Sequence, residues 1–254
     1  MSLLRVHHEG RGPTLLWLHG FTQTHRSAWR FRSILADQVH LITLDLPGHG
    51  DSSDLDGDLE SVADAVASAL DAPAAVGGYS FGGRVALHLV LRRPDLVTRL
   101  VVLGATRGIA DPIAREERRR DDDARARRIE AIGTEKFLDE WLSQPLLATM
   151  PADPRERAAR SADPRGLARS LRQCGTGTQE WLGERLAEVT VPVLALAGAL
   201  DLKFATEARA IASVAPQGRA EVVAGAGHAA HLEQPEQAAD LVARFLTTGR
   251  GAAQ

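Results

Sequence analysis

Five consecutive residues, Gly78-Tyr79-Ser80-Phe81-Gly82, form a G-x-S-x-G pattern that can make a serine hydroxyl a nucleophile or a base. This chemistry needs a sharp turn between a buried strand and a helix, and apolar segments flank the pattern on both sides. Small residues two positions either side of the serine accommodate the strained backbone of such a turn. Backbone N–H groups at the helix start would then favour negative charge that develops nearby. The alternative is a glycine-rich turn in which the serine only caps the helix.

A catalytic serine needs a base, and the base needs an orienting acid. Among nine histidines, His228 is the candidate base, because it follows a short apolar segment in a flexible glycine-containing turn. His231 is a close rival, but we expect it to be a surface histidine or one that reaches the site only through a neighbour. Asp201 is the candidate acid, since it follows a buried segment, and it could also cap the next helix. The chain order Ser80, Asp201, His228 is the order expected of a nucleophile-elbow enzyme.

Two loops at the same predicted sheet edge could complete the site. His19-Gly20-Phe21 ends the first buried strand, so the N–H groups of Phe21 and Phe81 are candidates for an oxyanion hole. An ordinary strand-to-loop turn is the alternative. Residues Asp45 to Gly50 form the second loop, whose expected role is structural, with a substrate contact from His49 as the alternative reading.

Arg84 lies four residues after Ser80, on the same face of the predicted helix. A cation in the first turns of a helix opposes the helix dipole, so the position is mildly unfavourable unless a bound anion offsets this interaction. An anionic ligand would do so through a bidentate pair with the guanidinium. The alternative is a structural salt bridge to a neighbouring carboxylate.

The elements that must position these residues alternate along the chain. Short apolar segments bounded by Gly, Pro or charged residues are typical of buried parallel strands, and amphipathic segments lie between them. This alternation predicts an α/β fold with a mostly parallel, doubly wound sheet. The predicted strands are Thr14–His19, Val39–Asp45, Ala74–Tyr79, Leu100–Ala105, Val193–Gly198 and Ala220–Val223, and the helices are Ala28–Asp37, Leu59–Leu70, Gly82–Arg92, Phe204–Ala215 and Pro235–Thr247.

The alternation stops after Ala105 and returns only near Leu186. The intervening stretch is charged, helical in pattern and interrupted by prolines. We therefore predict a core of residues 1–106 and 187–254, with residues 107–186 as a helical cap insertion. If the insertion folds over the sheet edge, some of its arginines would point at Ser80.

Amino-acid composition further limits the classes of protein to which the chain can belong. The chain has 254 residues, of which 44% are hydrophobic and 25% charged, as expected of a folded globular protein. A net charge of −3 gives no general attraction for nucleic acid. The longest apolar run is about ten residues, too short for a membrane span. A single cysteine and an N-terminus without a signal-peptide pattern lead us to expect a cytoplasmic protein. The sequence leaves the oligomeric state open.

The order of motifs resembles the α/β-hydrolase superfamily. It comprises His19-Gly-Phe, Asp45-Leu-Pro-Gly-His-Gly50 and Gly78-Tyr-Ser-Phe-Gly-Gly83, followed by Asp201 and His228. The absence of an aspartate at the nucleophile position argues against haloalkane dehalogenases.

Further segments resemble one branch of that superfamily, the 2-succinyl-6-hydroxy-2,4-cyclohexadiene-1-carboxylate synthases of menaquinone biosynthesis. The similarity runs from about Leu15 to Leu246. The segments are Gly78–Leu87, Arg115–Arg118, Phe137–Trp141 with Gln144-Pro145, Arg160-Ser161, Gly175–Gln179, Asp201–Phe204 and Gly225–Pro235. Ala199-Leu200 departs from the more polar residues usual before the aspartate, and the segment around Asp121–Asp123 is shorter than expected.

This resemblance implies a triad of Ser80, Asp201 and His228. It also implies substrate-binding side chains at Tyr79, Arg84, Arg118, Trp141 and Arg160. The implied reaction is elimination of pyruvate from 2-succinyl-5-enolpyruvyl-6-hydroxy-3-cyclohexene-1-carboxylate, a small polycarboxylate, without metal or organic cofactor. The alternative is a serine hydrolase, either a carboxylesterase or a C–C bond hydrolase, that acts on small acidic substrates with the same triad.

Overall fold

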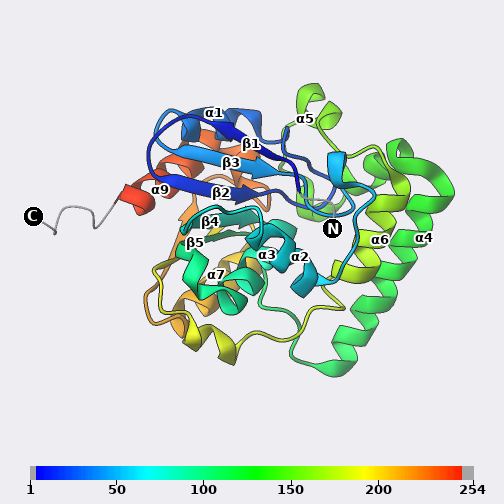
Figure 1. Cartoon of the computed structure of the whole chain (residues 1–254). Coiled ribbons are helices and arrows are strands. Elements are labelled where there is room, and N and C mark those ends of the chain that lie inside the picture. Colours follow the sequence, from blue (N-terminus) through cyan, green and yellow to red (C-terminus); the bar gives the residue numbers. More distant parts are fainter. Residues whose placement is uncertain (1–3, 248–254) are drawn as a thin grey trace, which may run out of the picture.

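The computed structural model describes residues 4–247 and places seven strands in one sheet. The order across the sheet is β1-β3-β2-β4-β5-β6-β7, and every neighbouring pair is parallel except β1 with β3. Figure 1 shows the sheet at the centre of the molecule, with helices on both faces. The strands are β1 Val6–Glu9, β2 Thr14–Leu18, β3 His40–Leu44, β4 Ala74–Tyr79, β5 Val97–Leu103, β6 Val193–Gly198 and β7 Gly218–Val223.

Helices divide between the two faces of this sheet. On one face, residues of α2, α3 and α7 pack in a hydrophobic core with the strand side chains that point toward them. On the other, α1 and α9 form a second core. β5 serves both cores, because Leu100 and Val102 point to the first and Val101 and Leu103 to the second. The helices are α1 Trp29–Ala36, α2 Leu59–Ala67, α3 Phe81–Arg92, α7 Leu202–Val214, α8 Ala230–Glu233 and α9 Pro235–Thr247.

The segment between β5 and β6 contains the helices α4 Pro112–Leu142, α5 Pro154–Ala158 and α6 Pro164–Cys174, and no strand. Each begins with a proline directly after an aspartate that caps it, since Asp111, Asp153 and Asp163 accept backbone N–H groups of the first turn. In Figure 1, α4 and α6 lie side by side beyond one edge of the α/β layers. A small core of its own, including Ala126, Ile129 and Leu167, joins them.

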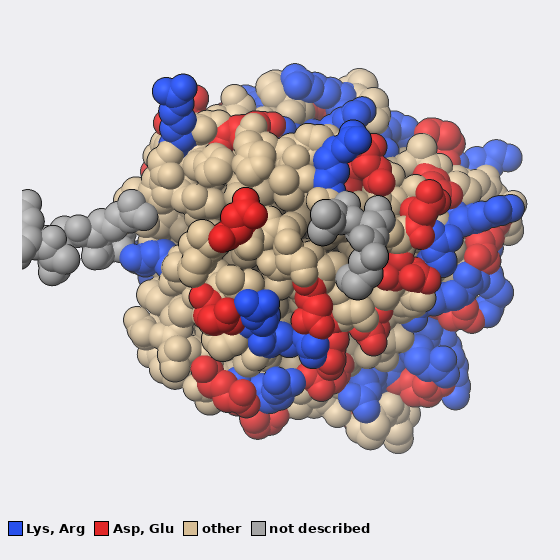
Figure 2. Space-filling model, viewed as in Figure 1, with Lys and Arg blue, Asp and Glu red and all other residues tan. Residues whose placement is uncertain are grey.

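α4 presents many charges on the outside of this segment. Ion pairs such as Arg119–Glu116 and Arg128–Glu140 run along it, and Figure 2 shows both signs of charge interspersed on this side of the molecule. Gly133 breaks the helix, with φ 76° and ψ 168°. These mixed charges match a solvated helix face rather than a binding surface for one sign of charge.

The doubly wound α/β fold predicted from the sequence is confirmed. The edge strand β1 and the short helix α8 are additional, and β7 begins two residues before the predicted start. β1 has only four residues, too few for a periodicity to be recognised. The division into a core and a cap remains a prediction, and its outer residues, 1–3 and 248–254, lie outside the described part. Within residues 4–247, no helix is long and apolar enough to cross a membrane.

Candidate active site

Ser80 occupies a strained turn between β4 and α3. Its φ of 50° and ψ of −105° lie where residues other than glycine rarely occur. Two glycines make the turn possible, because a Cβ on Gly78 would lie 2.4 Å from the Gly82 carbonyl carbon, and one on Gly82 would lie 2.2 Å from the Leu18 oxygen. The spacing of the G-x-S-x-G pattern therefore has a steric cause. The turn leaves the hydroxyl at the N-terminus of α3.

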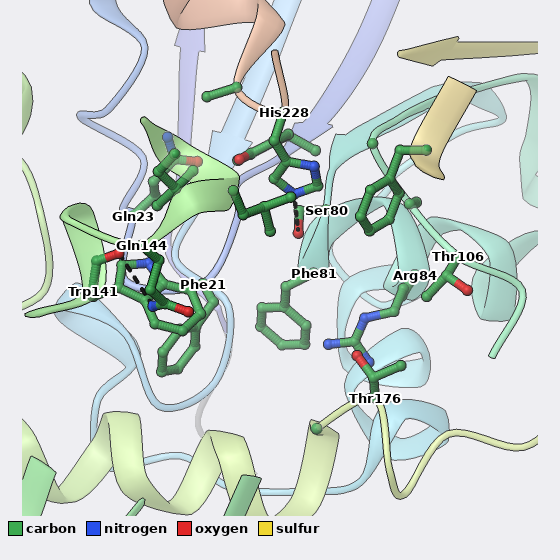
Figure 3. A pocket seen from close by; sticks show the side chains of 18 of the residues that line it. Phe21, Gln23, Ser80, Phe81, Arg84, Thr106, Trp141, Gln144, Thr176 and His228 are labelled. Atoms are coloured by element: carbon green, nitrogen blue, oxygen red, sulfur yellow. Dashed lines mark hydrogen bonds between the residues drawn. The ribbon is translucent and has the colours of Figure 1, made fainter. Parts of the chain in front are cut away.

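His228 and Asp201 lie next to this hydroxyl. His228 Nε2 is 3.4 Å from Ser80 Oγ, and His228 Nδ1 is 2.8 Å from Asp201 Oδ2 (Figure 3 shows the first contact). Asp201 also caps α7, because its Oδ1 accepts the Phe204 N–H at 3.2 Å. Burial alone would raise the pKa of Asp201, but hydrogen bonds from His228 and the Phe204 N–H lower it below the usual value. The carboxylate is therefore charged and can orient an imidazole that serves the serine.

Glu233 holds the loop that carries His228, a contact that the sequence analysis missed. Its two carboxylate oxygens accept the N–H of Gly227 at 2.7 Å and the N–H of Ala229 at 3.0 Å. The residues on both sides of the imidazole are therefore fixed by one side chain. This role of Glu233 could not be recognised from the sequence, because a glutamate five residues after a histidine is not a known motif.

The loop after β2 follows the strand that lies next to β4 in the sheet, and it lines the same cavity as Ser80. The N–H groups of Phe21 and Phe81 have no hydrogen-bond partner among residues 4–247. Both residues line the same cavity as Ser80. Two unengaged donors that line this cavity are candidates for an oxyanion hole.

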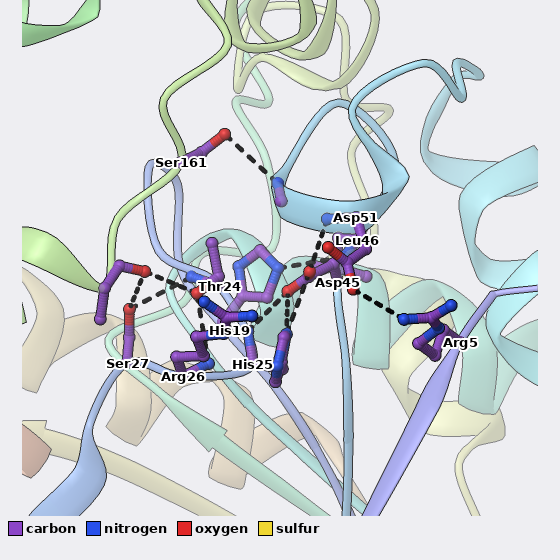
Figure 4. A network of polar contacts seen from close by, with 12 residues as sticks. Arg5, His19, Thr24, His25, Arg26, Ser27, Asp45, Leu46, Asp51 and Ser161 are labelled. Atoms are coloured by element: carbon purple, nitrogen blue, oxygen red, sulfur yellow. Dashed lines mark hydrogen bonds and ion pairs between the residues drawn. The ribbon is translucent and has the colours of Figure 1, made fainter.

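The second loop, residues 45–50, is held by hydrogen bonds around Asp45. Its carboxylate accepts the N–H groups of His25 at 2.6 Å and of Asp51 at 2.8 Å, while His19 Nε2 accepts the Leu46 N–H at 3.0 Å (Figure 4). Burial would raise the pKa of Asp45, but the hydrogen bond from His25 and the other donors lower it. These contacts support the structural role expected of the loop.

His49 makes no contact with the cavity. It is fully buried, and burial lowers its pKa to about 3, so its imidazole is neutral. Its Nδ1 donates to the Pro47 carbonyl, and its Nε2 accepts the Thr22 N–H at 3.3 Å. The alternative reading of a substrate contact by His49 is therefore not supported.

A cavity of about 330 Å³ opens above Ser80. Three arginines line it, Arg84 from α3, Arg118 from α4 and Arg160 from the loop after α5. In Figure 3, Arg84 lies on one side of Phe81, and Trp141, Gln144 and Phe21 lie on the other. Trp141 packs edge-on against Phe21, with ring centroids 5.2 Å apart. The cavity therefore combines an aromatic wall with a set of cations.

Arg84 is only 8% exposed and has no carboxylate at ion-pair distance among the described residues. Its Nη1 donates to the Cys174 carbonyl at 2.7 Å and approaches Gln179 Oε1 at 3.5 Å. Burial lowers the pKa of Arg84 to about 10, so it stays charged at neutral pH. The alternative of a structural salt bridge at Arg84 is therefore wrong, and the buried charge lacks a compensating anion.

Arg160 resembles Arg84 in this respect. Its Nη1 donates to Thr22 Oγ1 at 2.5 Å, and its Nη2 approaches Met150 Sδ at 3.7 Å. Burial lowers its pKa, and its Nε is buried without a hydrogen-bond partner within residues 4–247. Arg118 differs, because its side chain is 35% exposed and its Nε is bonded to Asp122 at 2.8 Å.

Tyr79 and His231 lie beneath the serine. His231 is 1% exposed, so it is not a surface histidine, and it meets the cavity only through its neighbours Tyr79 and Gln23, which was the other part of the expectation. Its ring is tilted against that of Tyr79 with centroids 4.2 Å apart and packs edge-on against Phe31, while burial lowers its pKa to about 3. His231 lies in the short helix α8, which was not predicted, and there its side chain points inward.

The sequence and the structure of this chain are similar to those of known proteins. The sequence profile of the alpha/beta hydrolase family matches residues 15–241. A relative from Bacillus subtilis (strain 168) is 34% identical over 246 residues, covering 91% of this chain and 89% of the relative, and its name proposes a 2-succinyl-6-hydroxy-2,4-cyclohexadiene-1-carboxylate synthase. The synthase of that name from Serratia proteamaculans (strain 568) is 30% identical over 250 residues, covering 94% of both chains. The solved structure of MenH from S. aureus superposes with a TM-score of 0.87 at 30% identity, covering 97% of this chain and 98% of the other.

Proposed function

The chain belongs to the alpha/beta hydrolase family and is an enzyme of that fold; from this premise we propose that it is a lyase that eliminates pyruvate from 2-succinyl-5-enolpyruvyl-6-hydroxy-3-cyclohexene-1-carboxylate. One observation carries the proposal. Arg84 is buried and Arg160 is partly buried in the cavity above Ser80, and neither has a carboxylate partner within residues 4–247. A substrate with several carboxylates would supply the missing anions.

In the proposed reaction, His228 accepts the Ser80 proton while Asp201 keeps the imidazole oriented. The serine oxygen then removes a ring proton next to the succinyl carbonyl. Negative charge develops on that carbonyl oxygen, and the N–H groups of Phe21 and Phe81 stabilise it. The ring electrons expel the enolpyruvyl group, which takes up a proton and leaves as pyruvate. No water is consumed and no acyl-enzyme forms.

Substrate binding in this proposal divides between the two predicted parts of the chain. Arg84 and Tyr79 belong to the predicted core, and Arg118, Trp141 and Arg160 belong to residues 107–186, which we propose as the cap. The arginines would hold the carboxylates and so fix the ring proton near Ser80. A cytoplasmic location is part of the same proposal, supported by the single cysteine.

The deciding experiment follows the products. Purified enzyme is given the enolpyruvyl substrate, and pyruvate is measured by a coupled dehydrogenase while absorbance reports the new diene. We expect one pyruvate per diene formed and no turnover by Ser80→Ala. Ser80, His228 and Asp201 could also catalyse hydrolysis. Ester or C–C cleavage with incorporation of labelled water oxygen, and no release of pyruvate, would therefore overturn the proposal.

A further inference from the structure

The loop after β2 commits three of four consecutive backbone N–H groups to internal partners. The Gly20 N–H donates to Gln23 Oε1 at 2.8 Å, the Thr22 N–H donates to His49 Nε2 at 3.3 Å, and the Gln23 N–H donates to the Gly20 carbonyl at 3.1 Å. Only the Phe21 N–H is left without a partner among the described residues. The loop is thus organised so that one donor stays available to the cavity.

Gln23 is the side chain that closes this arrangement. It is 2% exposed yet lines the cavity above Ser80, and Figure 3 shows it on the same side of Ser80 as Phe21. Its Oε1 accepts the Gly20 N–H, and its Nε2 lies 3.5 Å from Nε2 of His231. Because His231 is neutral, it can accept from this amide.

Gly20 cannot easily find another partner for its N–H. A Cβ at this position would lie 2.6 Å from the Tyr79 ring, so the backbone is packed tightly against it. Loss of the Gln23 acceptor would leave a buried donor without a partner, which is unfavourable. The nearest relief is rotation of the peptide units between Gly20 and Thr22, which would turn the Phe21 N–H away from the cavity.

We propose that Gln23 is a positioning residue, whose carboxamide holds the Phe21 N–H toward the oxygen that becomes negative during the reaction. The inference rests on the oxyanion hole of the proposed function and assigns its geometry to a side chain that need not touch the substrate. A glutamine suits the position, since a glutamate would keep the acceptor but add negative charge to a cavity built for anions.

The test uses a fluorophosphonate ester, which reacts with an activated serine whatever the natural substrate is. The Ser80 oxygen forms a bond to phosphorus as its proton passes to His228, fluoride leaves, and the phosphoryl oxygen, on which negative charge develops during the attack, occupies the oxyanion hole. We expect Gln23→Met, similar in size but without the acceptor, to lower the labelling rate and the kcat of pyruvate release about 10- to 100-fold. The KM should stay within about twofold, because the hole acts on the transition state.

Two further variants sharpen this result. Gln23→Glu keeps an acceptor for Gly20, so it should label faster than Gln23→Met while its KM for the polycarboxylate rises. Gln173→Met is the matched control, because Gln173 Oε1 also accepts a loop glycine N–H, that of Gly57 at 3.0 Å, but does not line the cavity. It should label like the wild type.

Equal labelling by Gln23→Met and the wild type, or an equal loss in Gln173→Met, would overturn the inference. So would a Gln23→Met variant that raises KM alone, since that result marks a ground-state substrate contact. If Gln23→Met does not fold, Gln23→Asn, whose shorter amide cannot span to Gly20, should show the same loss. A wild type that labels but releases no pyruvate would overturn the proposed reaction and leave the role of Gln23 standing.

Discussion

Arg84 reaches from α3 to the far side of the cavity, where its Nη1 donates to the backbone carbonyl of Cys174 at 2.7 Å. The two residues are 90 positions apart, and the bond uses only one of the five donors of the guanidinium. The remaining N–H donors of the guanidinium can bind a ligand. Arg84 therefore joins α6 to the serine helix and lines the cavity at the same time.

Substitution of Arg84 by lysine tests this double role. A lysine cannot hold the Cys174 carbonyl and still offer a planar pair of donors, so kcat/KM should fall about 10- to 100-fold. The unfolding midpoint should change little, because lysine keeps the aliphatic part of the side chain. Arg92→Lys, on the same helix but paired with exposed Asp64 and Glu60, is the control and should retain full activity. An unaltered kcat/KM in Arg84→Lys would remove it from the site.

Asp201→Asn separates the two tasks of Asp201. Asparagine is as good a helix cap as aspartate, so α7 should keep its stability. It cannot, however, stabilise an imidazolium or fix the required tautomer of His228, and kcat should fall about 10²- to 10⁴-fold. Asp163→Asn provides the comparison, since Asp163 caps α6 through Arg165 and Gly166 without a histidine partner. Steady-state kinetics and thermal melts of both variants suffice, and similar kinetics in the two would contradict a role for Asp201 in catalysis.

Arg118→Gln tests the proposal that Arg118, rather than the neighbouring Arg120, binds the substrate. Arg118 lines the cavity, whereas Arg120 is exposed and paired with Glu116. Loss of one charge-assisted contact should raise the KM for the polycarboxylate about 10-fold with a smaller effect on kcat. Arg120→Gln should leave both constants unchanged. The assignment is wrong if the two variants behave alike.

His88 makes stability depend on pH. It is 3% exposed, its Nε2 has no partner among the described residues, and burial lowers its pKa to about 4. Between that value and about 6.5, the unfolded chain binds a proton that the folded chain does not, so stability is full above this window and falls as the pH decreases through it. His49 and His231, whose pKa values are about 3, act in the same direction.

The corresponding experiment compares thermal melts at about pH 5 and pH 7.5 for the wild type and for His88→Leu. Removal of one such histidine should reduce the acid-induced loss by on the order of 1–2 kcal/mol. The leucine is apolar and of similar size, so the variant should fold. A pH dependence identical to that of the wild type would show that His88 is not buried in its neutral form.

Much of the candidate active site could be predicted from the amino-acid sequence, because local rules govern it. The positive φ of Ser80 and the close approach of Gly82 to β2 demand the G-x-S-x-G spacing within five residues. The apolar runs around it identify β4 and α3 for the same reason. The order of Ser80, Asp201 and His228 follows from loops that share one edge of a parallel sheet.

What only the tertiary structure decided are contacts between segments far apart in the chain. Arg160 bonds to Thr22 across 138 positions, and Gln23 approaches His231 across 208. Neither of these pairs has a fixed spacing or a periodicity. Their meeting depends on how α4 to α6 and the loop after β2 pack over the sheet, and packing is set by the whole core rather than by neighbours in the sequence.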